Sequence, residues 1–157
     1  ELVENQRGIT YFGLFGPYLA GAKKVVIEDA YVRKPYQLRN LAEFLEMLLR
    51  CKNPDEDVAV HLVTGHNEPG FVEAQLNGLN ELASTFAQLG VNLTYEFRDT
   101  LHDRSITADT GWEILPGRGL DIFQKFVDGD WLNPLLRHQQ LRRVKECKVT
   151  YRRVSEK

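Results

Sequence analysis

Hydrophobic positions recur along this chain with two periods, and its first third predicts a helix, a strand and a second helix. Apolar residues at helical spacing over Thr10 to Ala22 predict a short or broken helix, because Pro17 and three glycines interrupt the pattern. Lys24 to Glu28 is a brief β-branched run, typical of a strand covered on both faces. Tyr36 to Cys51 places leucines on one stripe and charged residues opposite, which predicts an amphipathic helix.

The middle of the chain continues this alternation of helices and strands. Val58 to Thr64 predicts a second buried strand, and Pro69-Gly70 opens a further helix, which Gly90 ends. Val91 to Phe97 alternates apolar and polar residues with the period of two that characterises a strand. Because strands follow one another with helices between them, we expect them to pair in parallel.

The last third of the chain predicts shorter elements. Ser105 to Thr107 and Trp112 to Leu115 predict a hairpin, Leu120 to Val127 a short helix, and Cys147 to Arg152 an edge strand. The expected architecture is one α/β domain, a mixed sheet flanked by helices, that takes up residues 1–157 without a linker or an internal repeat. Since the chain does not open on methionine, we expect it to be a C-terminal fragment of a larger protein.

Composition narrows the class of protein. A chain of 157 residues with 43% hydrophobic residues is long enough to bury a core as one soluble domain. It contains neither an apolar run long enough to span a bilayer nor a signal peptide, so we expect a cytoplasmic protein. Cys51 and Cys147 lie far apart and form no C-x-x-C pair, which predicts two buried, reduced thiols and neither a metal nor another cofactor.

Charge is distributed unevenly along the chain although the net charge is only -2. The segment from Arg137 to Lys157 holds eight lysines and arginines but only two acids. Such a basic end can mark an anionic partner, namely nucleic acid, an acidic membrane or an acidic neighbouring domain. It is equally typical of a solvated strand edge whose charges block aggregation.

Charged residues also follow two of the predicted strands, at the sheet edge where α/β proteins bind ligands. Asp29 and Arg33 come after the first strand, and His102 and Arg104 come after the third. An arginine fork and an imidazole suit a phosphate group, and Arg118, on a turn between two glycines, could reach the same edge. We therefore predict a phosphate-facing site built from these five residues.

The same side chains allow plainer interpretations. Asp103 could pair with Arg104 or Arg33, and Asp29 with Arg33, in which case the charges are structural. Further aromatic and histidine residues are expected to be structural too. Tyr31 and Tyr36 are expected to pack against the first helix, His61 to lie in the core and His66 in solvent.

The spacing His102-x-Arg104-x-x-x-x-Asp109 resembles the phospholipase D motif His-x-Lys-x-x-x-x-Asp. In enzymes of that superfamily two copies form one site, where one histidine attacks the phosphodiester and the other protonates the leaving group. This chain has one copy, with Arg for Lys, and Thr110 to Glu113 replaces the usual Gly-Ser-x-Asn. The resemblance thus implies a phospholipase D-like fold that binds phosphate through His102, Arg104 and Asp109. If the domain is active, these three would be catalytic, and a homodimer would supply the second copy.

Several further segments, in register, resemble the phospholipase D-like C-terminal domain of MIT-domain-containing proteins. The matching segments are Ile27 to Arg33, Tyr36 to Phe44, Leu101 to Arg104, Gly111-Trp112 and Gly117 to Asp121. Eukaryotic relatives use this domain as a dimeric, non-catalytic reader of anionic phospholipids. Thr110 to Trp112, Gly119 to Gln124 and the basic ending are also similar to the form found at the C-terminus of bacterial Lon-like AAA+ proteins of BREX-type phage-defence islands.

The resemblance implies a non-catalytic phosphate- or polyanion-binding and dimerisation domain. Its expected parent is a bacterial Lon-like, ATP-dependent protease-related protein, and its expected partners are DNA, a second copy and the upstream domains of that parent. An anionic phospholipid membrane is the alternative ligand. A dimeric phosphodiesterase or nuclease using His102, and a purely structural oligomerisation domain, are the alternatives from other classes.

Overall fold

A computed structural model describes residues 1–124 and 132–154 of the chain. Its six-stranded sheet has the order β3-β2-β1-β4-β5-β6, and the bounds are β1 Lys24–Glu28, β2 Val58–Thr64, β3 Val91–Phe97, β4 Ser105–Ala108, β5 Trp112–Pro116 and β6 Val149–Arg153. The first three strands pair in parallel, and the last three join them antiparallel. The predicted mixed sheet, its hairpin and its edge strand are therefore confirmed.

The helices form the second layer of the domain. They are α1 Tyr11–Leu19, α2 Pro35–Cys51, α3 Val72–Ala87, which the 3-10 turn η1 Pro69–Phe71 precedes, and α4 Pro134–Arg137, which the 3-10 turn η3 Gln139–Leu141 follows. Pro17 lies inside the short α1, as the sequence pattern predicts. Among the described residues, no helix is both long and apolar enough to cross a membrane.

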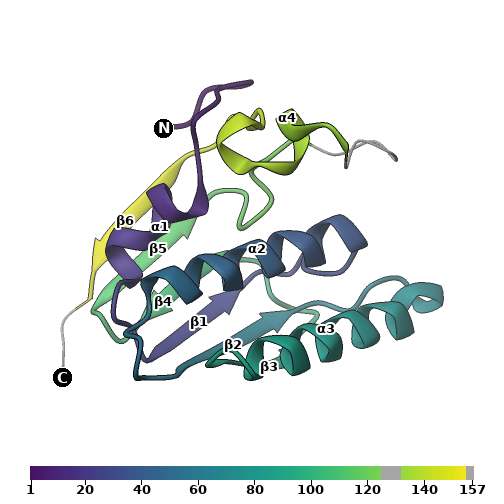
Figure 1. Cartoon of the computed structure of the whole chain (residues 1–157). Coiled ribbons are helices and arrows are strands. Elements are labelled where there is room, and N and C mark those ends of the chain that lie inside the picture. Colours follow the sequence, from purple (N-terminus) through teal and green to yellow (C-terminus); the bar gives the residue numbers. More distant parts are fainter. Residues whose placement is uncertain (125–131, 155–157) are drawn as a thin grey trace.

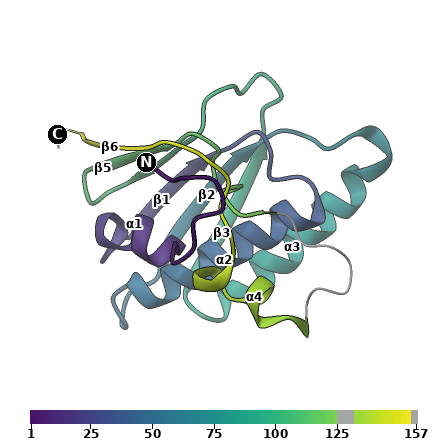
Figure 2. The same cartoon turned by 90° about the horizontal axis from the view of Figure 1, so that it is seen from above.

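Helices α1, α2 and α3 all cover the same face of the sheet (Figures 1 and 2). A buried row runs across that face through Leu62, Ile27, Ile106 and Ile114. Tyr18 of α1 stacks on Tyr151 beside this row, with the ring centroids 4.1 Å apart. The opposite face presents a more polar row of register partners, Thr94, His61, Val26, Thr107, Glu113 and Arg152. The expectation that β1 is covered on both faces is therefore wrong, because only its alternate residues face the helical layer.

The short helix expected over Leu120 to Val127 is wrong for its first five residues, and the remaining three lie outside the described part of the chain. Beside one short local bond, from Ile122 N to the Leu120 carbonyl, backbone groups here bond to a distant segment: Lys145 N donates to the Ile122 carbonyl, and Gln124 N to the Arg143 carbonyl. Leu120, Ile122 and Phe123 are all buried. Tertiary burial of these apolar side chains, with strand-like pairing, replaces the helix that their spacing suggests.

Three cations of the basic end of the chain pair with acids within the domain. Arg142 bonds Glu43 of α2, Lys145 bonds Asp121, and Arg152 of the edge strand β6 bonds Glu113. These acids come from earlier in the chain, so the charge asymmetry along the sequence is partly cancelled in space. The two cysteines are free, as expected, but only Cys147 is buried and Cys51 is half-buried.

Candidate functional site

Four segments that carry charge meet at one edge of the sheet, which we call the rim. Residues 29–31 leave the end of β1, and residues 117–118 leave the end of β5. Residues 102–104 lead into β4, and residues 146–148 lead into β6. Because β4 and β6 run opposite to β1 and β5, the starts of the former lie beside the ends of the latter. The sheet topology therefore collects all four segments in one place.

An open cavity of about 660 Å³ lies among these segments. We call it the rim pocket, and its lining residues are Tyr31, His102, Asp103, Arg104, Leu115, Pro116, Gly117, Arg118, Glu146, Cys147 and Lys148. Three permanent cations and a histidine face two acids in this lining. Neither Arg118 nor Lys148 has a carboxylate within ion-pair distance among the described residues. The rim pocket thus keeps positive charge available to an anion.

Asp29 lies beneath the rim pocket instead of in its wall. The residue is 2% exposed, and its carboxylate accepts hydrogen bonds from the backbone N–H groups of Tyr31 at 3.0 Å and Leu120 at 3.2 Å. Arg104 Nε lies 3.8 Å from the same carboxylate. Burial raises the pKa of Asp29, while the Tyr31 N–H, Arg104 and the Leu120 N–H oppose the rise. Asp29 therefore orders the loops of the rim, and its expected direct role in binding phosphate is not supported by this position.

A pH-dependent effect of Asp29→Asn follows from this burial. Ionisation of Asp29 costs more in the folded state, so the stability linked to its protonated form is present below its ordinary pKa of 3.8 and is lost as the pH rises through the higher folded pKa. Asparagine cannot ionise. We expect the free energy of unfolding of Asp29→Asn, relative to wild type, to increase over this pH interval and then level off. Urea unfolding at a series of pH values measures the difference, and a difference independent of pH would contradict the expectation.

Two guanidinium groups lie close to the Tyr31 ring at the rim. Its side chain is 43% exposed, so the expectation that it packs against the first helix is wrong. The guanidinium carbon of Arg104 is 4.9 Å from the Tyr31 ring centroid, and that of Arg33 is 4.8 Å from it. The ring attracts both cations through its electron-rich face. Arg33 does not line the rim pocket, and it meets that pocket only through Tyr31.

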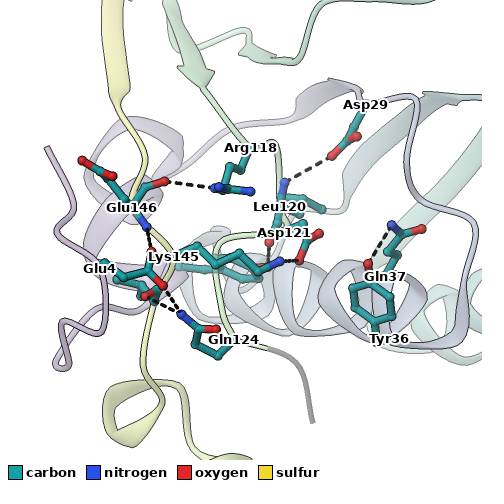
Figure 3. A network of polar contacts seen from close by, with 12 residues as sticks. Glu4, Asp29, Tyr36, Gln37, Arg118, Leu120, Asp121, Gln124, Lys145 and Glu146 are labelled. Carbon is teal, nitrogen blue, oxygen red and sulfur yellow. Dashed lines mark hydrogen bonds and ion pairs between the residues drawn. The ribbon is translucent and has the colours of Figure 1, made fainter.

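Arg118 stands on a turn that is fixed from both sides (Figure 3). Its Nε donates to the Glu146 carbonyl at 3.0 Å, and Lys145 bonds Asp121 at 2.9 Å. Gly117 lets the turn approach β6 closely, since a Cβ there would lie 3.0 Å from the Lys148 carbonyl. The structure thus brings Arg118 into the rim pocket with His102 and Arg104, as the sequence suggested.

Asp109, the third member of the phospholipase D-like pattern, is not at the rim. Its carboxylate accepts hydrogen bonds from the backbone N–H groups of Lys23 and Lys24, where β1 begins. Since β1 ends at the rim, Asp109 lies at the opposite end of the sheet from His102. It tethers the hairpin to the start of β1 and cannot contact a ligand in the rim pocket.

One of two further histidines differs from its expected position. His61, expected in the core, lies half-exposed on the open face of the sheet and bonds Thr94 Oγ1 and Glu96 Oε1, each at 2.8 Å. His66 is exposed, as expected, and its Nδ1 lies 2.9 Å from Asp99 Oδ2 while its ring stacks on Phe97. His66 directly follows the end of β2, so the rule that selected polar residues after strands could have found it.

Lys148 was missed because nothing in a basic tail distinguishes one cation from its neighbours. Its place in the rim pocket depends on the pairing of β6 with β5, in which Val149 lies opposite Pro116. Among the described residues, no group of three or more histidine, cysteine or acidic side chains has the geometry to hold a metal ion.

Comparison with known proteins agrees with this architecture. Residues 8–153 match the family described as a phospholipase D-like domain at the C-terminus of MIT. MIT domain-containing protein 1 of Mus musculus is 38% identical to the chain over 126 residues. That alignment covers 80% of this chain and 50% of the mouse protein, so the chain spans about half the length of this curated relative. The match over almost the whole sequence shows that the chain belongs to the family of phospholipase D-like domains found at the C-terminus of MIT.

Proposed function

We propose that this domain is a non-catalytic module that binds phosphate-bearing anions in the rim pocket. One observation carries the proposal: Arg104, Arg118, Lys148 and His102 line a single open cavity, and two of these cations have no acid partner among the described residues. Arginine presents parallel N–H groups to phosphate oxygens, and lysine adds a point charge. The proposed accessory role in a longer protein is supported by the half-length match to the mouse relative.

The residues of the rim pocket favour binding of phosphate over hydrolysis of a phosphodiester. A phospholipase D-like reaction uses two histidines, and His102 is the single histidine in the described lining. Asp109 is at the other end of the sheet, and Arg104 replaces the lysine of the motif. A second copy could supply the missing histidine, because the His102 side chain is exposed. A phosphohistidine formed with a phosphodiester substrate, and lost in His102→Ala, would overturn the binding-only proposal in favour of a dimeric phosphodiesterase.

Two sources of the phosphate follow from two possible parents. In a bacterial Lon-like, ATP-dependent protein of a phage-defence island the proposed ligand is DNA, whose backbone would be held by charge and released by salt. In an MIT-type parent the proposed ligand is an anionic phospholipid membrane. The match to the mouse MIT protein supports the second source. So does the exposure of the aromatic Tyr31 side chain at the rim, which is 43% exposed, because aromatic rings partition to the bilayer interface.

Replacing Arg104 and Arg118 together with glutamine is expected to weaken binding of the true polyanion by at least about tenfold, since two charge-assisted contacts are lost. Sedimentation with phosphatidylserine vesicles and fluorescence anisotropy with duplex DNA, both at low and moderate salt, measure the effect and separate the two sources. Arg50→Gln, at the far end of α2, is the matched control. Unchanged binding to both polyanions would show that Arg104 and Arg118 do not bind the ligand, and it would overturn the proposed function.

Dimerisation completes the proposal and is supported by the family resemblance. A dimer would place two rim pockets on one particle, which raises affinity for a surface that carries many phosphates. Sedimentation equilibrium of the isolated chain tests this part, and a monomer at all concentrations would remove it.

A further inference from the structure

Contacts with Asp99 and Phe97 hold His66 in place at the rim, outside the rim pocket. Its Nδ1 lies 2.9 Å from Asp99 Oδ2, and its backbone N–H donates to Asp99 Oδ1 at 2.8 Å. The ring stacks on Phe97 with centroids 4.1 Å apart and planes 20° apart. One ring nitrogen and one ring face are therefore engaged, which leaves Nε2 without a hydrogen-bond partner among the described residues. The imidazole is therefore held in one orientation, and its Nε2 can still form a hydrogen bond.

Arg33 lies beside His66 and is not neutralised by a direct ion pair. Its Nη1 donates to the His66 carbonyl at 3.1 Å. No carboxylate lies within ion-pair distance of its guanidinium among the described residues, and both oxygens of Asp99 already face His66. Arg33 Nε is buried and has no hydrogen-bond acceptor among the described residues, so hydrogen bonds to acceptors hold the guanidinium at Nη1 only.

Tyr31 lies between the rim pocket, which it lines, and the pair formed by Arg33 and His66. The guanidinium carbons of Arg33 and Arg104 lie 4.8 Å and 4.9 Å from the Tyr31 ring centroid. The two cations are therefore no farther apart than the sum of these distances. Two phosphate groups on one small organic skeleton can span such a gap, while the exposed Tyr31 ring offers an apolar surface to the skeleton between them.

We propose that Arg33 and His66 form a second anion subsite, so that the rim prefers a ligand with two phosphate groups over one with a single phosphate. One phosphate occupies the rim pocket on Arg104 and Arg118, and the other contacts Arg33 and His66 Nε2 across Tyr31. This inference rests on the proposed function, because it needs the rim pocket to hold the first phosphate. The shared chemistry is a pair of phosphate monoesters, carried by a soluble metabolite or by a lipid headgroup.

Titration calorimetry of the full chain with fructose 1,6-bisphosphate and with inorganic phosphate tests the proposal. We expect the bisphosphate to bind wild type at least tenfold more tightly than inorganic phosphate. The double variant Arg33→Gln with His66→Gln should lose this preference while it binds inorganic phosphate as wild type does. Arg50→Gln with His61→Gln is the matched control, because it removes the same two residue types far from the rim and should keep the preference.

The outcomes separate this inference from the proposed function. Equal affinity of wild type for both anions, or a preference that survives in Arg33→Gln with His66→Gln, overturns the second subsite and leaves the rim pocket standing. Failure of wild type to bind either anion overturns the proposed function. If the double variant folds poorly, the His66 Cε1–H resonance of wild type decides: it should move with the bisphosphate and stay in place with inorganic phosphate, and an unmoved resonance overturns the inference.

A vesicle arm separates the two sources of the paired phosphates. Vesicles that contain a bisphosphorylated lipid are compared with vesicles of equal charge made with phosphatidylserine. A preference for the first that Arg33→Gln with His66→Gln abolishes supports the subsite on a lipid headgroup. A preference for soluble bisphosphate alone supports a metabolite, and a vesicle preference that the variant retains contradicts the subsite.

Discussion

Alanine at position 119 is expected to lower the free energy of unfolding by about 2–4 kcal/mol, because it combines backbone strain with overpacking. Gly119 has φ +61°, a left-handed conformation that residues with a Cβ adopt at a cost. A Cβ here would overlap Asp29 Oδ2 and lie 2.7 Å from Asp29 Cγ and 3.1 Å from Arg104 Cδ. Asp29 cannot move aside easily, since it is buried and holds the backbone N–H of Leu120.

Urea unfolding of Gly119→Ala measures this loss, with Gly70→Ala as the control. A Cβ on Gly70 would meet nothing within 4 Å, so that variant should stay within about 0.5 kcal/mol of wild type. Part of the loss should be recovered when Asp29→Ala is added to Gly119→Ala, because the colliding carboxylate is then absent. A Gly119→Ala protein as stable as wild type would show that the 117–121 turn can move away from Asp29 at no cost. Asp29 would then not order the loops of the rim.

Leucine in place of Arg142 is expected to cost about 3–5 kcal/mol, because it strands a partly buried acid. Arg142 is 3% exposed, and its Nη1 bonds both oxygens of Glu43 at 2.8 Å and 3.0 Å. Its guanidinium carbon also lies 4.4 Å from the Phe123 ring centroid. This pair anchors the segment before β6 to α2, and that segment continues into the pocket wall at Glu146 to Lys148.

A double-mutant cycle of Arg142→Leu and Glu43→Leu in urea unfolding tests this expectation. The double variant should lose much less stability than Arg142→Leu alone, since no unpaired charge remains. Arg98→Leu is the control pair-breaking variant: Arg98 pairs with Glu96, and the two side chains are 48% and 47% exposed, so its loss should cost no more than about 1 kcal/mol. Additive losses in the Arg142 and Glu43 cycle would mean that the two side chains do not depend on each other.

Local patterns were sufficient to place most of the elements. The observed bounds of β1, β2 and β3 coincide with the predicted runs Lys24 to Glu28, Val58 to Thr64 and Val91 to Phe97. These runs are short, β-branched or alternating, and are flanked by residues that break strands. The predicted helix at Leu120 is absent because its apolar spacing fits a helix, whereas Ile122 and Gln124 pair through their backbones with Lys145 and Arg143, 23 and 19 residues away. Spacing along the chain does not reveal that pairing.

Some residues of the candidate site could likewise be predicted from local sequence, and others could not. Arg33, His102 and Arg104 could be selected because each lies within a few residues of a strand end, and strand ends in α/β sheets collect ligands. Asp109 was selected with them from a motif, yet the strand β4 separates it from Arg104. A strand advances about 3.3 Å for each residue, so a motif that spans a whole strand divides its members between opposite edges of the sheet.

The sequence by itself determined the α/β class, the parallel strands, the amphipathic α2 and the charged segments that follow β1 and β3, because each depends on residues close together in the chain. Only the tertiary structure decided that one face of the sheet carries α1, α2 and α3, that Asp29 is buried beneath the rim, and that Lys148 joins His102 in one pocket. Burial and charge pairing depend on which distant segments meet. Strand order and direction determine which distant segments are in contact, and local periodicity does not predict these contacts.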